Sequence, residues 1–377
     1  MFFRWVTAFS LGMLVLATPA SAQSDTTEPR TTVGGYGEVH YTNLSGRDTP
    51  GLINLARFVV YLGHEFSDRI ALRSELEVED AKVEGGQDGG EVSIEQAYLD
   101  YTLSDRVTLR AGLVLAPVGI VNELHEPTSF NGVERPGFDH DVLPTTWREL
   151  GVGAVGSLPV AGGLTYRLYL LNGLKAEGFS ASEGIRGGRQ EGKEASFANP
   201  SLTGRLEYGR PGLKLGGAFW YGGSANQDST LGNGAFAAPF LVLSADVRYD
   251  RGPLMLRGVV ARISIKDAEE INARFGGSVG RRIEGGYAEV AYDLLHALAP
   301  RSGHRLNAFV RHERYDTQAA VADGTPRDPG LARRTTTFGL SWKPLWNVVF
   351  KGDYQLRRNR AGLGEQEAVA LGVGYQF

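Results

Sequence analysis

Residues 122–153 contain the side chains whose types could do chemistry, namely two histidines and six carboxylates. Histidine and carboxylate together suit a metal site or an acid–base pair. The spacing does not support either function, because the stretch HEPTS that begins at His125 lacks the second histidine of H-E-x-x-H, and Pro127 would break a helix there. His140 lies between Asp139 and Asp141, a run typical of a solvated turn. We therefore expect no metal ion and no catalytic residue in this stretch.

Residues 151–156 read GVGAVG, which matches the G-x-G-x-x-G pattern of dinucleotide-binding proteins. That motif requires a following helix, but SLPVAGG follows here. Apolar residues alternate with the glycines, which favours a strand. The sequence contains neither a G-x-S-x-G elbow nor a P-loop. We accordingly predict no cofactor and no enzymatic activity.

The N-terminus resembles a secretory signal. Arg4 precedes an apolar run at 5–17, and Ala20-Ser21-Ala22 forms an A-x-A cleavage site. The apolar run is shorter than the about 20 residues of a membrane-spanning helix. We predict a signal peptide at 1–22, a polar leader at 23–32 and an exported protein.

Composition excludes several classes of function. Cysteine is absent, so there can be no disulfides or thiolate ligands. The 39 Lys and Arg nearly balance the 43 Asp and Glu, which gives no reason to expect nucleic acid as a partner. Glycine is abundant, with 51 residues, and 15 Tyr and 17 Phe accompany it, as suits curved strands with aromatic interfaces.

Strict period-two patterning runs through 33–377 and predicts an all-β protein. In RIALRSELEV (69–78), apolar residues occupy one face and charged residues the other. Sixteen such segments can be counted, and their connections alternate between short turns and long polar loops. This pattern predicts a 16-stranded antiparallel transmembrane β-barrel. We expect the barrel to lie in the lipid of the outer membrane of a Gram-negative bacterium. A soluble β-sandwich is the alternative, but it gives no reason for that alternation. The final Phe377 resembles the C-terminal signature of outer-membrane barrels.

Sixteen closed strands leave a lumen too wide for side chains to fill, so we expect water inside. Charged residues on the polar face of the strands should line this lumen, because lipid would penalise them. The predicted lumen-facing wall residues include Arg57, Arg69, Arg73, Glu75, Arg106, Arg110, Arg167, Arg205, Arg248 and Arg311. The wall as a whole leans basic, which predicts a mild anion preference.

The connection at 116–148 is the longest without an obvious strand. Its apolar residues and three prolines argue against a disordered tail, so we expect the third outer loop to fold into the lumen and narrow it. The predicted constriction residues are Asn122, Glu123, His125, Glu126, Glu134, Arg135, Asp139 and Asp141.

The segment GLVLAPVGIVNELHEPTSFNGVERP, followed by LPTTWRELGVG, resembles the phosphate-selective porin O/P family. The matching positions are Gly112, Pro117, Gly119, 122–123 and 134–135. The resemblance implies a homotrimeric porin with an inward third loop. It does not carry phosphate selectivity to this chain, since only seven lysines are present and none are clustered.

The expected function is passive diffusion of small hydrophilic solutes or anions. The alternatives are a barrel enzyme and an adhesin or receptor, neither of which conducts. Ohmic conductance in a planar bilayer would separate the channel from both alternatives.

Overall fold

The computed structural model describes residues 30–46, 51–80, 90–160, 162–225 and 237–377. The predicted signal peptide at 1–22 and residues 23–29 of the predicted leader lie outside these described residues, whereas residues 30–32 of the leader form the start of the first strand. No helix among the described residues is long and apolar enough to cross a membrane.

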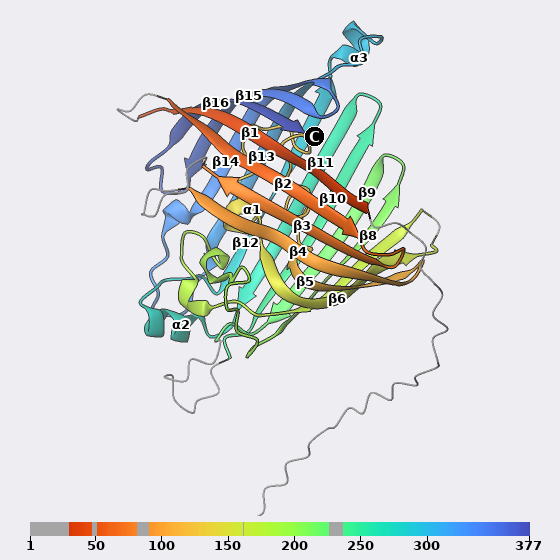
Figure 1. Ribbon diagram of the computed structural model, residues 1–377. Coiled ribbons are helices and arrows are strands. Elements are labelled where there is room, and N and C mark those ends of the chain that lie inside the picture. Colours follow the sequence, from red (N-terminus) through yellow and green to blue (C-terminus); the bar gives the residue numbers. More distant parts are fainter. Residues whose placement is uncertain (1–29, 47–50, 81–89, 161, 226–236) are drawn as a thin grey trace, which may run out of the picture.

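Sixteen strands form one closed antiparallel barrel, as predicted (Figure 1). The strands are β1 (Arg30–Leu44), β2 (Leu52–Glu65), β3 (Ile70–Glu79), β4 (Glu91–Ser104), β5 (Val107–Leu115), β6 (Arg148–Leu158), β7 (Leu164–Leu171), β8 (Ser201–Arg210), β9 (Leu213–Gly222), β10 (Phe240–Arg251), β11 (Leu254–Ile265), β12 (Arg282–Asp293), β13 (Arg305–Ala320), β14 (Ala332–Leu345), β15 (Val348–Asn359) and β16 (Gln366–Gln376). Each strand pairs with its neighbours along the chain, and β1 also pairs with β16, from Tyr36 opposite Gln376 to Leu44 opposite Ala368.

The helices are short and lie in the connections. They are α1 (Phe138–Asp141), α2 (Ala268–Phe275) and α3 (Leu295–Leu298), with 3-10 turns η1 (Ala176–Gly178), η2 (Arg186–Gly188) and η4 (Pro329–Leu331). Figure 1 shows α2 and α3 at opposite ends of the barrel, and α1 behind the strands of the front wall. Sequence patterning did not predict α2, whose last residue, Phe275, is followed by Gly276 with a left-handed φ of 70°.

Short and long connections alternate around the barrel. The turns at 66–69, 105–106, 211–212, 252–253 and 346–347 define the short-turn end, together with the connections 159–163 and 294–304. The other end, named the long-loop end here, carries the connections 116–147, 172–200 and 266–281 among others. The predicted strand ends differ from the observed ones by a few residues, and β13 extends to Ala320 because a bulge in β12 lets Arg282 pair there.

The outward face of the wall is apolar along most of its height. On β10, Leu243 and Val247 are exposed on the outer face, whereas Ser244 and Asp246 are buried on the inner face. This alternation is what a lipid-facing wall around a polar interior requires.

A hydrophobic core lies inside the barrel rather than between layers. The connection 116–147 contributes Val118, Phe138, Leu143 and Trp147 to it, and the inner face of β9 contributes Trp220. The rings of Trp147 and Trp220 lie 4.3 Å apart, centroid to centroid. Further members come from 172–200, α2 and the inner faces of β10–β12. Part of the lumen is therefore filled by packed side chains.

Gly112 offers a direct test of the wall geometry. Its φ is +139°, and a Cβ placed there would lie 2.3 Å from the Ala97 carbonyl oxygen and 2.7 Å from the Tyr98 Cα. Gly112→Ala should therefore destabilise the barrel by more than about 2 kcal/mol, because both the backbone conformation and the space are wrong for a side chain. Heat-dependent mobility on SDS gels after refolding measures the folded fraction. Gly217→Ala is the matched control, since its nearest neighbour lies 4.0 Å away, and equal folding of both variants would contradict the prediction.

Candidate functional site: a loop bridging the lumen

Asn122 closes the base of the 116–147 loop. Its side-chain amide donates to the carbonyl oxygens of Ala116 (2.7 Å) and Trp147 (3.0 Å), and its oxygen accepts from the Trp147 N–H (2.8 Å). Asn122 is only 2% exposed, so these bonds are shielded from water. The predicted constriction residue thus fixes the point where the loop leaves and rejoins the wall.

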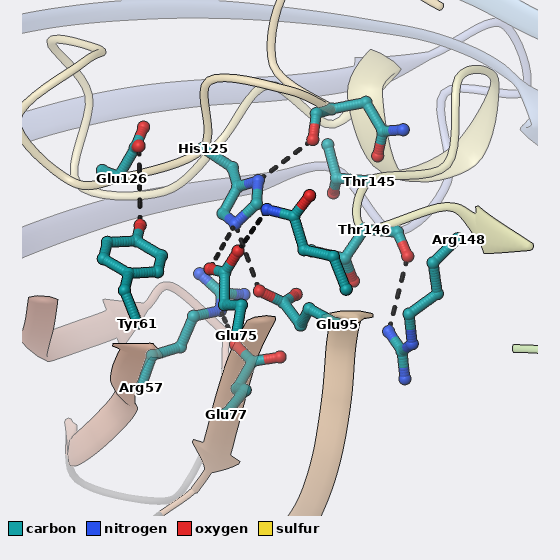
Figure 2. A network of polar contacts seen from close by, with 12 residues as sticks. Arg57, Tyr61, Glu75, Glu77, Glu95, His125, Glu126, Thr145, Thr146 and Arg148 are labelled. Atoms are coloured by element: carbon teal, nitrogen blue, oxygen red, sulfur yellow. Dashed lines mark hydrogen bonds and ion pairs between the residues drawn. The ribbon is translucent and has the colours of Figure 1, made fainter. Parts of the chain in front are cut away.

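His125 anchors the loop to strands β3 and β4. Figure 2 shows its ring directed at the wall, between Glu75 and Glu95. Its Nε2 lies 3.3 Å from Glu75 and 3.2 Å from Glu95, and its Nδ1 lies 3.0 Å from the carbonyl oxygen of Asn122. All three side chains are buried. With both ring nitrogens facing oxygen acceptors, the geometry fits an imidazolium that donates from each of them.

The charge of His125 follows from its surroundings. Burial lowers the pKa of the imidazole, but the charge of Glu95 and hydrogen bonds to Glu75 and Glu95 outweigh burial and raise the pKa of His125 to about 10. Ligand atoms of Glu75, Glu95 and His125 all lie within 4.8 Å of one another. These residue types could hold a divalent cation, but Nε2 of the protonated ring already donates to one oxygen of each carboxylate.

The polar contacts continue away from His125. Arg57 pairs with Glu38 (2.5 Å) and with Glu77 (3.1 Å), so it neutralises the next carboxylate along β3. Tyr61 donates to Glu126 across 3.5 Å. Arg135 donates to the carbonyl oxygen of His125 (3.2 Å).

The opposite wall also holds the loop. Lys351 on β15 donates to the Gly132 carbonyl oxygen (2.8 Å), and Asp353 accepts from the Val133 N–H (2.7 Å). Asn131 donates to Glu289 on β12 (2.8 Å). Residues 122–135 consequently bridge the lumen from β3 and β4 to β12 and β15.

Asp139 and Asp141 have different environments although both were predicted as constriction carboxylates. Burial and the nearby Glu313 charge raise the pKa of Asp139 well above its usual range. Asp141 pairs with Arg333 and accepts from the Tyr315 hydroxyl (2.8 Å), and its pKa is lowered by His140, Arg333 and Tyr315 despite its burial. His140 also lies 2.7 Å from Asp141, so the two histidines of the sequence segment have separate partners. Asp141 is the ionised member of the two.

The remaining loop carboxylates contact wall arginines directly. Glu123 pairs with Arg167 (2.8 Å), and Glu134 pairs with Arg357 (3.3 Å). Opposed charges are therefore joined in pairs rather than separated across open water.

The predicted wall residues occupy three kinds of position. Arg69 and Arg106 lie exposed in the turns before β3 and β5. Arg73 pairs with Glu65 and Arg110 with Asp100. The most buried pairs are Arg205 with Asp246 and Arg311 with Glu289 and Glu313, and Arg248 pairs with Glu207. The expectation that wall charges keep to one face is incomplete, because Arg262, Arg314 and Arg334 lie on the outward face of β11, β13 and β14.

Two cavities lie on either side of the bridging loop. The long-loop vestibule, of about 730 Å³, is lined by arginines and carboxylates in similar numbers, including Arg57, Arg148, Glu77 and Glu313. The short-turn vestibule, of about 560 Å³, has five basic lining residues against two acidic ones. The basic residues are Arg110, Arg167, Arg205, Lys214 and Arg248, and the acidic residues are Glu123 and Glu207. The lumen is polar and open on both sides of the loop.

Comparisons with known proteins show which proteins this chain resembles. No family model matches the sequence, so that comparison does not support the resemblance to phosphate-selective porins. An uncharacterized protein of Aquifex aeolicus is 36% identical over 352 residues, which cover 89% of this chain and 78% of that protein. The chain belongs to the same family as this Aquifex protein.

Solved structures share the fold of this chain at low identity. The OmpF complex with daunomycin from Salmonella typhi has a TM-score of 0.59 and 14% identity, covering 92% of this chain and 97% of that one. The outer-membrane channel DcaP of Acinetobacter baumannii has a TM-score of 0.57 and 10% identity over 93% and 98%. OmpT of Vibrio cholerae in its trimer form has a TM-score of 0.56 and 10% identity over 93% and 100%. The fold is that of general outer-membrane porins.

Glu95 is the site residue that sequence patterning missed. The register between β3 and β4 shifts so that Glu75 pairs with Gln96 and Leu76 with Ile94, which leaves Glu95 as the extra residue of a bulge. Glu95 and Gln96 therefore both point to Glu75 or His125 from one strand. The adjacent polar pair in an otherwise alternating strand was the available signal.

The Asn122 contacts predict a measurable tether. Asn122→Ala removes three buried hydrogen bonds and leaves backbone groups unpaired, so it should lower the free energy of unfolding by at least about 2 kcal/mol. Urea unfolding of the refolded barrel in detergent measures this change. Asn43→Ala on an exposed part of β1 is the control, and an equal, small effect of both substitutions would contradict the role of Asn122.

The His125 anchor predicts a pH dependence. Because the folded pKa of about 10 exceeds the ordinary value of 6.5, the stabilisation is complete below about pH 6.5 and is lost as pH rises through about 10. The difference in unfolding free energy between wild type and His125→Gln should shrink steadily over that window. Urea midpoints at pH 6, 8 and 10.5 measure it, with titrating lysines and tyrosines common to both proteins. A difference that does not change with pH would show that His125 is neutral in the folded barrel.

Proposed function

We propose that the protein is an outer-membrane diffusion channel for small hydrophilic solutes. The two polar vestibules on opposite sides of the loop carry this proposal, because a barrel that served only as a scaffold would need neither. The bridging loop would then set the narrowest cross-section, with the pairs Glu123–Arg167 and Glu134–Arg357 at its edges.

The charge of the short-turn vestibule supports an anion preference. Five basic residues face two carboxylates there, and rings of one charge in a pore favour the opposite ion. The long-loop vestibule is balanced, so selection would occur after a solute passes the loop. Lys214 and Arg167 are the cations of this lining most available to an ion, because 53% of the Lys214 side chain and 28% of the Arg167 side chain are exposed.

The same proposal includes the cellular setting. Residues 1–22 would direct export, the barrel would lie in the outer membrane of a Gram-negative bacterium, and the channel would assemble as a homotrimer. The structural likeness to OmpT in its trimer form supports the assembly. The long-loop end would face the outside and the short-turn end the periplasm.

Planar-bilayer recording of the refolded full chain tests the channel. We expect ohmic steps and, in a tenfold KCl gradient, a zero-current potential that shows anion preference. Arg167→Gln combined with Lys214→Gln should reduce the anion-to-cation permeability ratio at least twofold, because two of the five vestibule cations are removed.

Arg251→Gln is the control, since Arg251 is exposed at the short-turn end of β10 and does not line the vestibule. Absence of conductance would overturn the channel proposal. A wild-type cation preference would overturn the anion preference alone.

A further inference from the structure

Three arginines lie side by side on the outer face of the barrel wall. Arg314 on β13 is the direct partner of Arg334 on β14, and Arg334 is the direct partner of Arg358 on β15. Directly opposed residues on neighbouring strands have Cβ atoms about 4.5–5.5 Å apart, so like charges in this arrangement repel. We call these three residues the arginine row.

Neighbouring carboxylates neutralise only one member of the row. Arg358 pairs with Glu365 (3.0 Å) and Glu367 (3.7 Å). Within the described part of the chain, Arg314 and Arg334 form no ion pair, and both are exposed. Two cations that face each other on a wall without a counter-charge call for an anion from outside the chain.

The height of the row on the wall identifies where that anion would lie. On the outer face of β14, going from the short-turn end toward the long-loop end, the exposed apolar residues Trp342, Leu340 and Phe338 are followed by Thr336 and Arg334. Eight residues separate Trp342 from Arg334, a distance of about 26 Å along a strand. At the usual strand tilt this is about 20 Å along the membrane normal, close to the about 25 Å of the apolar band. The row therefore lies at the boundary of hydrocarbon and headgroups, toward the long-loop end.

Polar groups that could bind an anion continue beside the row. His312 and Thr336, one step closer to the apolar band on the same face, lie 2.9 Å apart through Nδ1 and Oγ1. On the adjoining strands, Arg262 (3.0 Å) and Arg282 (3.3 Å) share the single carboxylate Glu284. The outward surface of β11–β15 thus has more cations than anions.

An apolar hollow adjoins these cations. A hollow of about 1920 Å³ on the outer wall is lined by Arg262, Arg314 and Arg334 and by the exposed apolar residues Leu206, Leu243 and Val260. One surface therefore offers guanidinium groups at headgroup height and apolar side chains at hydrocarbon depth. Arginine forks bind phosphate oxygens bidentately.

We propose that the arginine row binds the phosphate groups of an anionic lipid in the outer leaflet, whose acyl chains occupy the adjoining apolar hollow. The proposal rests on the membrane placement given under the proposed function but not on conduction. Free phosphate would contact the guanidinium groups without using the apolar hollow.

Thermal unfolding of the refolded full chain in a zwitterionic detergent tests the lipid site. The titrants are bis-phosphorylated lipid A, the same lipid with its phosphates removed, and inorganic phosphate. Phosphorylated lipid A should raise the unfolding temperature of the wild type in a saturable way, and the other two should not. Arg314→Gln combined with Arg334→Gln should raise the half-saturating concentration at least tenfold.

Arg251→Gln, an exposed arginine at the opposite end of the wall, is the matched control and should keep the wild-type response. If the double variant does not refold, Arg334→Lys serves in its place, because it keeps the charge but loses the bidentate fork, and it should weaken binding by a smaller factor. Equal responses of wild type and the refolded variants would overturn the proposal, as would a full shift with inorganic phosphate or with dephosphorylated lipid.

Conductance recorded from the same variants keeps the two proposals separate. The row faces away from the lumen, so Arg314→Gln with Arg334→Gln should conduct like wild type. Loss of lipid binding with unchanged conductance supports the lipid site. Lipid binding by a wild type that does not conduct would leave the lipid site standing while the channel proposal fails.

Discussion

A lipid-embedded wall must satisfy every backbone N–H and C=O within its own sheet, because hydrocarbon offers no partner. Pairing of β1 with β16 meets this requirement by removing both edges, and the terminal Phe377 adds a reciprocal pair of hydrogen bonds with Gly35. Closure then separates an apolar exterior from a polar interior, so alternate residues along each strand face opposite environments. The ion pairs of the lumen and the inward course of the 116–147 loop both depend on that separation.

The interior combines two kinds of packing. On the β9–β12 side, aromatic residues such as Phe138, Trp147 and Trp220 form a dry core. On the β2–β4 side and at β15, the loop is held by charges, with His125 and Lys351 as the cationic contacts. Apolar packing fixes where the loop lies, and ion pairs satisfy the loop carboxylates Glu123, Glu134 and Asp141. The unfilled volume is divided into two vestibules as a result.

Much of the fold could be predicted from the sequence because strand parity is a local property. All sixteen strands were found, and the long connection at 116–148 was expected inside the lumen. Parity fails at bulges, which is why Glu95 was missed, and it cannot tell which inward groups meet across the lumen. Parity also does not show that Arg314 and Arg334 lie directly opposite each other on the outward face, because that depends on the register between β13 and β14. The α2 helix escaped detection because eight residues give too little periodicity.

The bridging loop has a mechanical consequence for the barrel. A closed sheet resists stretching along its hydrogen bonds, but an empty cylinder flattens easily when pressed from the side. Residues 125 and 132 are hydrogen-bonded to β3–β4 and to β15, so the loop connects opposite sides of the barrel and resists its flattening. Lateral pressure on the wall is thereby carried through the loop itself, so a change in the roundness of the wall shifts the residues that cross the lumen.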